Sequence, residues 1–274
     1  MKKKNLISRL RNAAEYVTID SGDTMAMERI DKILSSQNIA SRSGIKAMIK
    51  AGKILADGKI VKRPEEKFDP DHTVFTVNGE TVAISKYIYI MMNKPKGVLS
   101  ASKDGHATTV IDLLPEEYKR RDLFPAGRLD KDTEGFLLIT NDGELAHKML
   151  APKSHVYKLY EAECDTTLTE DTVKAFAEGI CEGETRFLPA ELKLTGEKTA
   201  LVEICEGKFH QIKRMFHAVG AEVVRLKRLK IGGVWLDESL SAGSTRLLTK
   251  SEVFLLLSRN HGIISQNPYT NCTI

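Results

Sequence analysis

Long apolar runs, paired cysteines and a strong bias of charge are all missing from this sequence of 274 residues. No run approaches the roughly 18 consecutive apolar residues that a membrane-spanning helix needs. The basic opening MKKKNLISRLRN leads into the polar stretch AAEYVTIDSGD, which lacks the apolar core of a secretory signal. We therefore expect neither a membrane-bound nor a secreted protein, and we predict a cytoplasmic location.

The four cysteines are scattered along the chain, and no two of them form a C-x-x-C pair. This spacing predicts neither a zinc site nor a disulfide framework. Reduced cysteines, with the buried ones acting as small apolar side chains, are the simpler interpretation. We expect no bound metal.

The formal net charge is only +4, from 41 Lys and Arg against 37 Asp and Glu. A value this small does not by itself identify a nucleic-acid partner. Because 42% of the residues are apolar, the chain can bury a substantial core, and its length suits one large domain and one small one. The position of the charges along the chain is more informative than their sum.

Regular periodicity begins after residues 1–26, which are expected to form a flexible extension. Apolar residues then recur at helical spacing in two short stretches, and the second stretch follows Ser41 or Ser43 as its N-cap. Two turns of the D-G and N-G type separate short apolar runs and predict hairpins. Residues 27–84 are therefore predicted to form a small domain of two helices and a small sheet.

The charges of this small domain are mostly of one sign. Between Arg29 and Arg63 nine residues are basic and two are acidic, which gives a net charge of +7. Arg42, Lys46 and Lys50 recur every four residues and gather on one side of the second predicted helix, away from its apolar residues. Such a row suits a phosphate backbone. The pattern resembles the alpha-L RNA-binding domain, which implies that these three side chains bind RNA.

A second unit, residues 85–260, mixes strand-like and helical stretches. Apolar runs such as FLLIT, KLYEAEC and TALVEIC are typical of strands, whereas DGELAHKMLA, TEDTVKAFAEGI and FHQIKRMFHAVG have helical spacing. Helices interspersed among strands with hairpin-like neighbours predict an α+β domain in which helices pack on a sheet. The polar end, residues 261–274, is expected to be a frayed tail.

The densest cluster of unusual residues is AGRLDKDTEGFLLITNDGEL, residues 126–145. Its glycines permit tight turns, so an acidic loop is predicted at the edge of a sheet. A calcium loop would fit the first acidic positions, but its twelfth position must supply a bidentate carboxylate and is Asn141 here. A phosphoaspartate enzyme would place its aspartates directly after a buried strand and would need further acids downstream to hold magnesium, and the sequence offers neither.

A third interpretation fits this segment better. GRLDKDTEGFLLITNDG resembles the catalytic signature of the pseudouridine synthase family typified by ribosomal small subunit pseudouridine synthase A, and the aspartate of its GRLD is Asp130 here. Three more motifs follow the family's order: NKPKG at 93–97, HVYKLYEA at 155–162 and EGKFHQIKRMF at 206–216. The resemblance covers residues 27–258. It implies an alpha-L domain followed by a catalytic domain with a mixed, mainly antiparallel sheet flanked by helices.

The resemblance also implies a reaction that needs no cofactor, the isomerisation of a uridine in RNA to pseudouridine. Asp130 is the expected catalytic carboxylate, which can attack covalently or assist proton removal at the ribose. Lys213 is expected to keep this carboxylate ionised. Tyr160 is expected to pack on the target base and to serve as a proton-removing group, although a strand tyrosine in the core would fit the residue pattern alone. The order of the covalent steps stays open.

Further roles concern the bound RNA. Arg128 is expected to fill the space that a flipped nucleotide leaves, or else to contact phosphate. Asp132 and Glu134 would repel RNA, so we expect them to turn away or to pair with nearby bases such as Lys131. Basic residues between 208 and 230 would extend the RNA track. The other expected substrate-binding residues are Asn93, Lys94, His210, Gln211 and Arg214.

The segments HQIKRMF and IGGVWLD resemble the small-subunit enzymes more closely than the large-subunit ones. This resemblance implies a monomer that acts on structured rRNA, either 16S rRNA or a small-subunit assembly intermediate. An enzyme acting on 23S rRNA is the nearest alternative. A non-catalytic rRNA-binding or assembly protein with the same fold is another, and the retention of Asp130, Tyr160 and Lys213 together argues against it.

Overall fold

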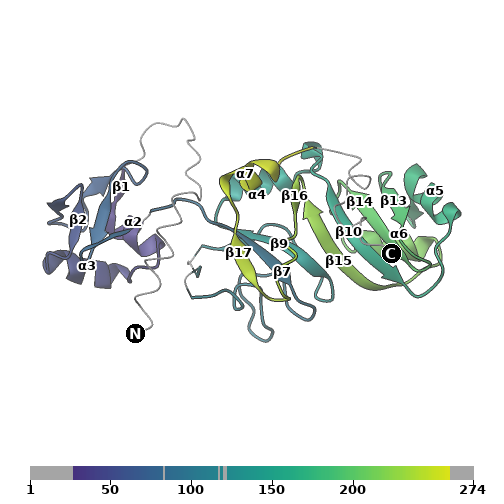
Figure 1. Cartoon of the computed structure of the whole chain (residues 1–274), viewed down its shortest axis with the longest axis horizontal. Coiled ribbons are helices and arrows are strands. Elements are labelled where there is room, and N and C mark those ends of the chain that lie inside the picture. The colour runs from purple at the N-terminus through teal and green to yellow at the C-terminus, as the bar shows by residue number, and fades with distance from the viewer. Residues whose placement is uncertain (1–26, 83, 117, 120–121, 260–274) are drawn as a thin grey trace. The chain divides into compact units, whose positions relative to one another are not determined.

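The computed structural model describes residues 27–259, except 83, 117 and 120–121 (Figure 1). The expected extension 1–26 and tail 261–274 lie outside these residues. The chain divides into two compact units, each of which is treated by itself below. Among the described residues, the smaller comprises 27–89, 114–123 and 247–250, and the larger comprises 90–113, 124–246 and 251–259.

The smaller unit contains the two helices and the small sheet that the sequence predicts. Its helices are α2 (Ile30–Ser36) and α3 (Arg42–Lys50). Ser41 is the N-cap of α3, because its hydroxyl oxygen accepts a hydrogen bond from the Gly44 N–H at 3.1 Å. Four strands pair antiparallel in the order β3-β2-β5-β6, and β1 pairs with β4. The strands are β1 (Glu28–Arg29), β2 (Ile54–Ala56), β3 (Lys59–Ile60), β4 (Lys67–Phe68), β5 (Phe75–Val77) and β6 (Glu80–Val82).

Helix α3 has one buried and one exposed side. Ile45 and Ile49 are buried in a core that also contains Phe75 of β5. Arg42 and Lys46, like Lys50 at the end of the helix, are exposed. The predicted separation of apolar and basic residues on this helix is therefore confirmed.

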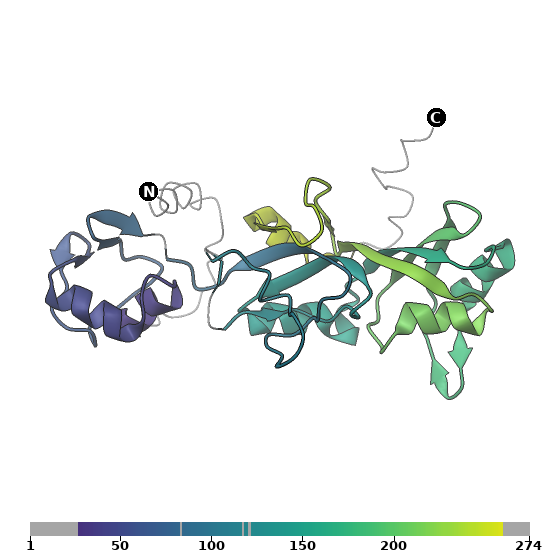
Figure 2. The ribbon, with the colours of Figure 1, turned by 90° about the horizontal axis from the view of Figure 1, so that it is seen from below.

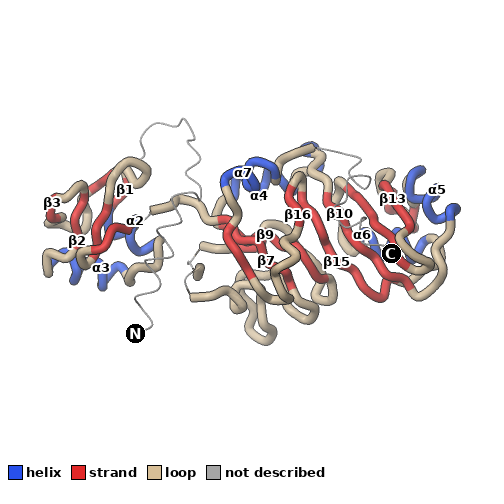
Figure 3. The backbone as a smooth tube through the Cα atoms, viewed as in Figure 1, coloured by secondary structure: helices blue, strands red, loops and turns tan. Residues whose placement is uncertain are grey.

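The larger unit is built on one sheet with the strand order β13-β14-β10-β15-β9-β7-β17, in which β16 also pairs with β15 and β8 with β9 (Figure 3). Strands β8 and β9, and successive members of β13-β14-β10-β15-β16, pair antiparallel, whereas β15 and β9 are parallel. The predicted mixed, mainly antiparallel sheet is therefore confirmed. The strands of the sheet are β7 (Tyr89–Lys94), β8 (Phe124–Pro125), β9 (Glu134–Thr140), β10 (Lys158–Cys164), β13 (Glu191–Leu194), β14 (Thr199–Ile204), β15 (Val223–Ile231), β16 (Val234–Trp235) and β17 (Thr245–Leu247).

The helices of the larger unit pack on this sheet, and α4 and α6 lie on the same side of it (Figure 2). The Asp142 carboxylate caps α4 by accepting a hydrogen bond from the Leu145 N–H at 3.0 Å. The helices are α4 (Gly143–Leu150), α5 (Glu170–Glu178), α6 (Gln211–Ala218) and α7 (Lys250–Leu255), with a short 3₁₀ turn at Pro152–Ser154 and a hairpin of β11 (Cys181–Glu182) and β12 (Thr185–Arg186). No helix in the described part of the chain is long and apolar enough to cross a membrane.

The register of three central strands, β10, β15 and β9, fixes where the acidic loop before β9 lies. Tyr160 of β10 pairs with Arg228 of β15, and Arg228 pairs in turn with Gly135 of β9. Gly135 has φ +99°, and a Cβ atom there would lie 2.3 Å from the Arg228 carbonyl oxygen. Only glycine permits this approach. The acidic loop before β9 is therefore held directly beside β15.

Candidate active site

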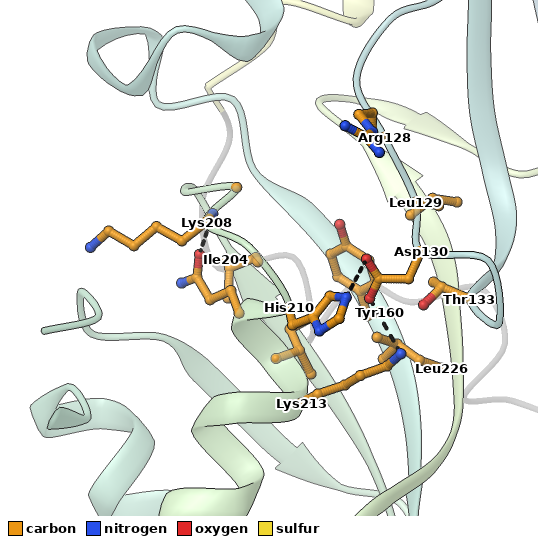
Figure 4. Close-up of a pocket in the computed structure, with 13 residues that line it drawn as sticks. Arg128, Leu129, Asp130, Thr133, Tyr160, Ile204, Lys208, His210, Lys213 and Leu226 are labelled. Carbon is orange, nitrogen blue, oxygen red and sulfur yellow. Dashed lines mark hydrogen bonds and ion pairs between the residues drawn. The ribbon is translucent and has the colours of Figure 1, made fainter. Parts of the chain in front are cut away.

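An open pocket lies where the acidic loop, strand β10 and the start of α6 meet (Figure 4). It encloses about 440 Å³, including some space open to solvent. Its lining consists of Arg128, Leu129, Asp130, Thr133, Tyr160, Ile204, Gly207, Lys208, His210, Gln211, Ile212, Lys213 and Leu226.

Asp130 lies in a loop whose backbone is held by hydrogen bonds on both sides of this residue. The Ser100 hydroxyl donates to the Leu129 carbonyl oxygen at 2.8 Å and accepts from the Leu129 N–H at 3.1 Å. The Thr133 N–H donates to the carbonyl oxygen of Asp130 at 3.1 Å. The backbone on both sides of Asp130 is therefore fixed, while 28% of its side chain stays exposed to the pocket.

Lys94 lies beneath this loop and holds it from below. Its side chain is fully buried. The ammonium donates hydrogen bonds to the carbonyl oxygens of Thr133, Pro95 and Lys131, at 2.9, 3.1 and 3.3 Å. Burial lowers the pKa of Lys94 to about 8, and the nearby carboxylates, first among them Asp132, oppose that shift. Lys94 braces the loop and does not face a ligand, which corrects the expectation that it binds substrate.

Two side chains reach the Asp130 carboxylate from the start of α6. The Lys213 ammonium lies 3.3 Å from Asp130 Oδ2, and the His210 Nε2 atom lies 3.4 Å from Oδ1. Figure 4 shows both side chains directed at Asp130. The pairing of Asp130 with Lys213 is the arrangement that the family resemblance implies, and it places a positive charge beside the carboxylate.

Lys213 has a second and closer partner. Its ammonium lies 2.6 Å from Asp132 Oδ1, and this hydrogen bond lowers the pKa of the Asp132 carboxyl group. Glu134 pairs with Arg225 at 3.0 Å. Both acids are thus paired with bases, as expected, but the partners are Lys213 and Arg225 and not Lys131. The reason is that the loop faces α6 and β15, which lie far away in the sequence.

Tyr160 forms part of the pocket wall and is held from behind by Arg228. Only 8% of Tyr160 is exposed. One Arg228 nitrogen donates to the Tyr160 hydroxyl oxygen at 3.4 Å, and another donates to the Phe136 carbonyl oxygen at 2.7 Å. The guanidinium carbon lies 5.9 Å from the centre of the tyrosine ring. The tyrosine is therefore both a core residue and a pocket residue, so the two sequence interpretations of it are compatible.

The expected RNA track between residues 208 and 230 needs correction. Arg228 and Lys230 are buried, with 5% and 2% exposed, in the part of β15 that lies inside the sheet between β10 and β9. Neither side chain can meet a phosphate at the surface. Lys158 of β10 is a further buried cation, and burial lowers its pKa to about 8, with a smaller contribution from repulsion by Arg228.

Three other expected substrate contacts are engaged within the protein. The buried Asn93 amide donates to the Leu240 carbonyl oxygen at 2.7 Å. Gln211 lines the pocket, but its side chain accepts from the Lys208 N–H at 3.1 Å and donates to the Glu206 carboxylate at 3.1 Å. Arg214 pairs with Glu182 and donates to the Thr185 hydroxyl oxygen at 3.0 Å. These three side chains are engaged within the protein, and their expected contacts with RNA stay predictions.

Arg128 lies exposed on the pocket lining, whereas Arg42, Lys46 and Lys50 belong to α3 of the other unit. Sequence reasoning missed Ser100, and it assigned Arg228 to the RNA track and not to the support of Tyr160. No local pattern marks these two roles, because the partners Leu129 and Tyr160 lie far away in the sequence.

The pocket combines a fixed carboxylate, an ammonium and an imidazole beside it, and an aromatic wall. A carboxylate in this setting can act as a nucleophile or as a proton acceptor, and the ammonium can stabilise its charge. Among the described residues, no three His, Cys, Asp or Glu side chains are placed to hold a metal ion.

Comparisons with known proteins agree with this geometry. The chain matches the RNA pseudouridylate synthase family over residues 88–218 and the S4 domain family over residues 28–74. It is 47% identical over 233 residues to an uncharacterized RNA pseudouridine synthase of Bacillus subtilis, covering 83% of this chain and 98% of the relative. It is 35% identical over 227 residues to the ribosomal small subunit pseudouridine synthase A of Escherichia coli, covering 82% and 98%.

A solved structure supports the same assignment. The crystal structure of a pseudouridylate synthase superimposes with a TM-score of 0.60 at 34% identity, covering 84% of this chain and 99% of that one. The S4 match corresponds to the alpha-L RNA-binding domain predicted from the sequence. The chain therefore belongs to the RNA pseudouridylate synthase family, in the group that includes ribosomal small subunit pseudouridine synthase A, with an S4 domain before its synthase domain.

Proposed function

We propose that this enzyme isomerises one uridine of 16S rRNA to pseudouridine, with Asp130 as the catalytic carboxylate. The observation that carries the proposal is the contact between Asp130 and Lys213 at 3.3 Å, in a pocket that Tyr160 also lines. A fixed carboxylate with a cation beside it and an aromatic wall suits a reaction at the sugar of a nucleotide held in the pocket. Because the pocket opens to solvent beside Asp130, a nucleotide extruded from its stack can reach the carboxylate.

The reaction rearranges bonds within the RNA, so its atoms balance without another reactant. The bond between C1′ of the ribose and N1 of the base breaks, the base turns, and a bond forms between C1′ and C5. The proton on C5 is then lost, and N1 gains a proton. Asp130 contributes either by forming an ester bond to the substrate or by assisting proton removal at the ribose, and both routes begin from its ionised form.

The other pocket residues have separate tasks in this proposal. Lys213 stabilises the ionised carboxylate while the pocket is empty and balances its charge against the approaching RNA. Tyr160 supports the face of the target base and serves as a proton-removing group. Because Arg228 fixes the tyrosine from behind, the aromatic wall keeps its orientation while the base turns. Arg128, exposed on the lining, enters the space that the extruded nucleotide vacates.

RNA docking is assigned to the S4 domain. Arg42, Lys46 and Lys50 form an exposed basic row on α3, and cations in such a row bind phosphates without reading sequence. This row supplies affinity, while the pocket selects the nucleotide that reacts. The choice of 16S rRNA rests on the relatives named ribosomal small subunit pseudouridine synthase A, and it places the activity in the cytoplasm, where ribosomes are assembled.

The test is to incubate the full chain with 16S rRNA, 23S rRNA and a small-subunit assembly intermediate, and to map pseudouridines chemically. Conversion of one uridine in 16S rRNA or in the intermediate is the expected result. Conversion in 23S rRNA alone would reject the small-subunit target while keeping the activity. Tight RNA binding without any conversion would instead identify a non-catalytic rRNA-binding protein.

A further inference from the structure

Phe209 is a large apolar side chain that lies in solvent at the rim of the pocket. It stands between Lys208 and His210, both of which line the pocket, but it does not line the pocket itself. The residue is 74% exposed. A single exposed apolar residue is ordinary on a protein surface, so exposure alone assigns no role. The contacts of this side chain distinguish it.

The Phe209 ring is stacked on the imidazole of His210. The ring centres are 3.7 Å apart and the planes are inclined by 19°. His210 in turn contacts Asp130, with its Nε2 atom 3.4 Å from the carboxylate. Phe209, His210 and Asp130 thus form a continuous series of contacts from the rim to the reacting carboxylate. Because most of Phe209 is exposed, the ring face away from His210 is open.

The backbone around Phe209 is fixed by its own hydrogen bonds. The Gln211 N–H donates to the Lys208 carbonyl oxygen at 3.2 Å, and the Lys208 N–H donates to the Gln211 side-chain oxygen at 3.1 Å. His210 has φ +50°, a left-handed conformation that is uncommon for a residue other than glycine. Such conformations cluster at sites that bind ligands. The closed turn therefore presents Phe209 in one orientation.

We propose that the open face of Phe209 stacks on a nucleobase adjacent to the uridine that is isomerised. This inference rests on the proposed function, because it requires an RNA nucleotide in the pocket beside Asp130. Extruding one nucleotide from a stack leaves its neighbours without one stacking partner. An aromatic ring at the pocket rim replaces that partner, and it accepts any base because every base has a flat face. Phe209 is a positioning residue that holds the RNA in register for Asp130.

The first experiment compares the full-length wild type with Phe209→Ala, Phe209→Leu and Phe209→Trp on the rRNA that contains the mapped uridine. Phe209→Leu keeps apolar volume without a flat ring, and Phe209→Trp enlarges the ring. Phe254→Ala is the matched control, because Phe254 is 83% exposed on α7, whose residues do not line the pocket. We expect the alanine and leucine variants to lose about 5- to 100-fold in single-turnover efficiency, with tryptophan and the Phe254 control near wild type.

The second experiment measures stacking directly. A stem-loop with the mapped uridine carries 2-aminopurine, whose fluorescence falls when it stacks, at the nucleotide before or after that uridine. Wild type should quench one of the two positions more strongly than Phe209→Ala does, and Phe254→Ala should quench like wild type. Removing the base at the quenched position should lower wild-type efficiency and leave Phe209→Ala nearly unaffected.

The outcomes separate the two proposals. If wild type converts no uridine in either rRNA, the proposed function fails, and this inference fails with it. If wild type converts a uridine and Phe209→Ala matches it in rate and quenching, the stacking proposal is overturned, and the proposed function stands. If Phe209→Leu loses as much single-turnover efficiency as Phe209→Ala, the result supports stacking by a flat ring. Full activity of Phe209→Leu would show that apolar bulk suffices and would refute stacking.

Discussion

Lys213 offers the sharpest perturbation of the proposed site, because it is shared by two carboxylates. Its ammonium lies 3.3 Å from Asp130 and 2.6 Å from Asp132. Replacing it with methionine keeps the volume of the side chain and removes the charge. Two carboxylates would then lie beside the incoming RNA without the ammonium between them, and the His210 imidazole would stay 3.4 Å from Asp130.

The size of the effect follows from the geometry. A pair of unit charges 3.3 Å apart interacts by about 5 kcal/mol at an effective dielectric constant of about 20, and by about 1.3 kcal/mol in bulk water. The Lys213 and Asp130 side chains are 23% and 28% exposed, so we take a value between these limits, about 2–3 kcal/mol. If this energy supports the reactive form of Asp130, Lys213→Met should lower the single-turnover rate by about 30- to 150-fold.

The assay is single-turnover pseudouridine formation with saturating enzyme, which separates the rate from RNA affinity. Lys213→Arg keeps the charge and should retain the rate within about tenfold, with some loss because its planar group fits two carboxylates differently. The pKa of the Asp132 carboxyl group, which the hydrogen bond to Lys213 holds below its usual range, should rise in Lys213→Met. A Lys213→Met rate within threefold of wild type, measured under the same conditions, would refute the electrostatic argument.

Three further predictions concern folding and RNA binding. Burial lowers the Lys158 pKa from 10.5 to about 8, so below pH 8 the folded protein carries a cost of about 3 kcal/mol that disappears as the pH rises past 10.5. Lys158→Met should therefore raise stability in urea unfolding at pH 7 and much less at pH 10; a loss at pH 7 would contradict the burial cost. Gly135→Ala should cost about 3 kcal/mol or more, because its Cβ would meet a backbone carbonyl of β15, whereas Gly143→Ala, with open space around its Cβ, should cost little in the same unfolding assay. Replacing Lys46 and Lys50 with alanine should weaken RNA binding and flatten its salt dependence by about one unit of slope per lysine; an unchanged slope in a binding titration would exclude α3 as the docking surface.

Much of the fold was predictable from local signals. The serine cap and the apolar spacing of α3 gave its bounds and its buried side, and the D-G and N-G turns gave the hairpins of the S4 domain. The GRLD loop was predictable as a presented acidic loop because Gly135 ends it at the start of β9. Motif order then pointed to Asp130, Tyr160 and Lys213, which the fold brings to one pocket.

The orientation of charged side chains was not predictable in the same way. Four of the nine residues in VVRLKRLKI are basic, and they were expected to extend an RNA track, yet Arg228 and Lys230 are buried. Strand β15 pairs with β10 and β9, and an irregularity in its register with β10 falls between Leu159 and Tyr160. Burial there depends on neighbours from distant parts of the chain, and a single sequence does not contain that information. Lys94 was expected to bind substrate, yet it is buried beneath the acidic loop, because its partners Lys131 and Thr133 also come from a distant part of the chain.

The central claim is that the carboxylate of Asp130 carries out the reaction, and replacing it with the isosteric amide tests this most directly. Asp130→Asn keeps the shape of the side chain and removes its charge and nucleophilicity. The measurement is pseudouridine formation on 16S rRNA, alongside RNA affinity, for this variant and the wild type. We predict no detectable turnover with near-normal RNA affinity, whereas substantial residual turnover would contradict the account and assign the catalytic group elsewhere.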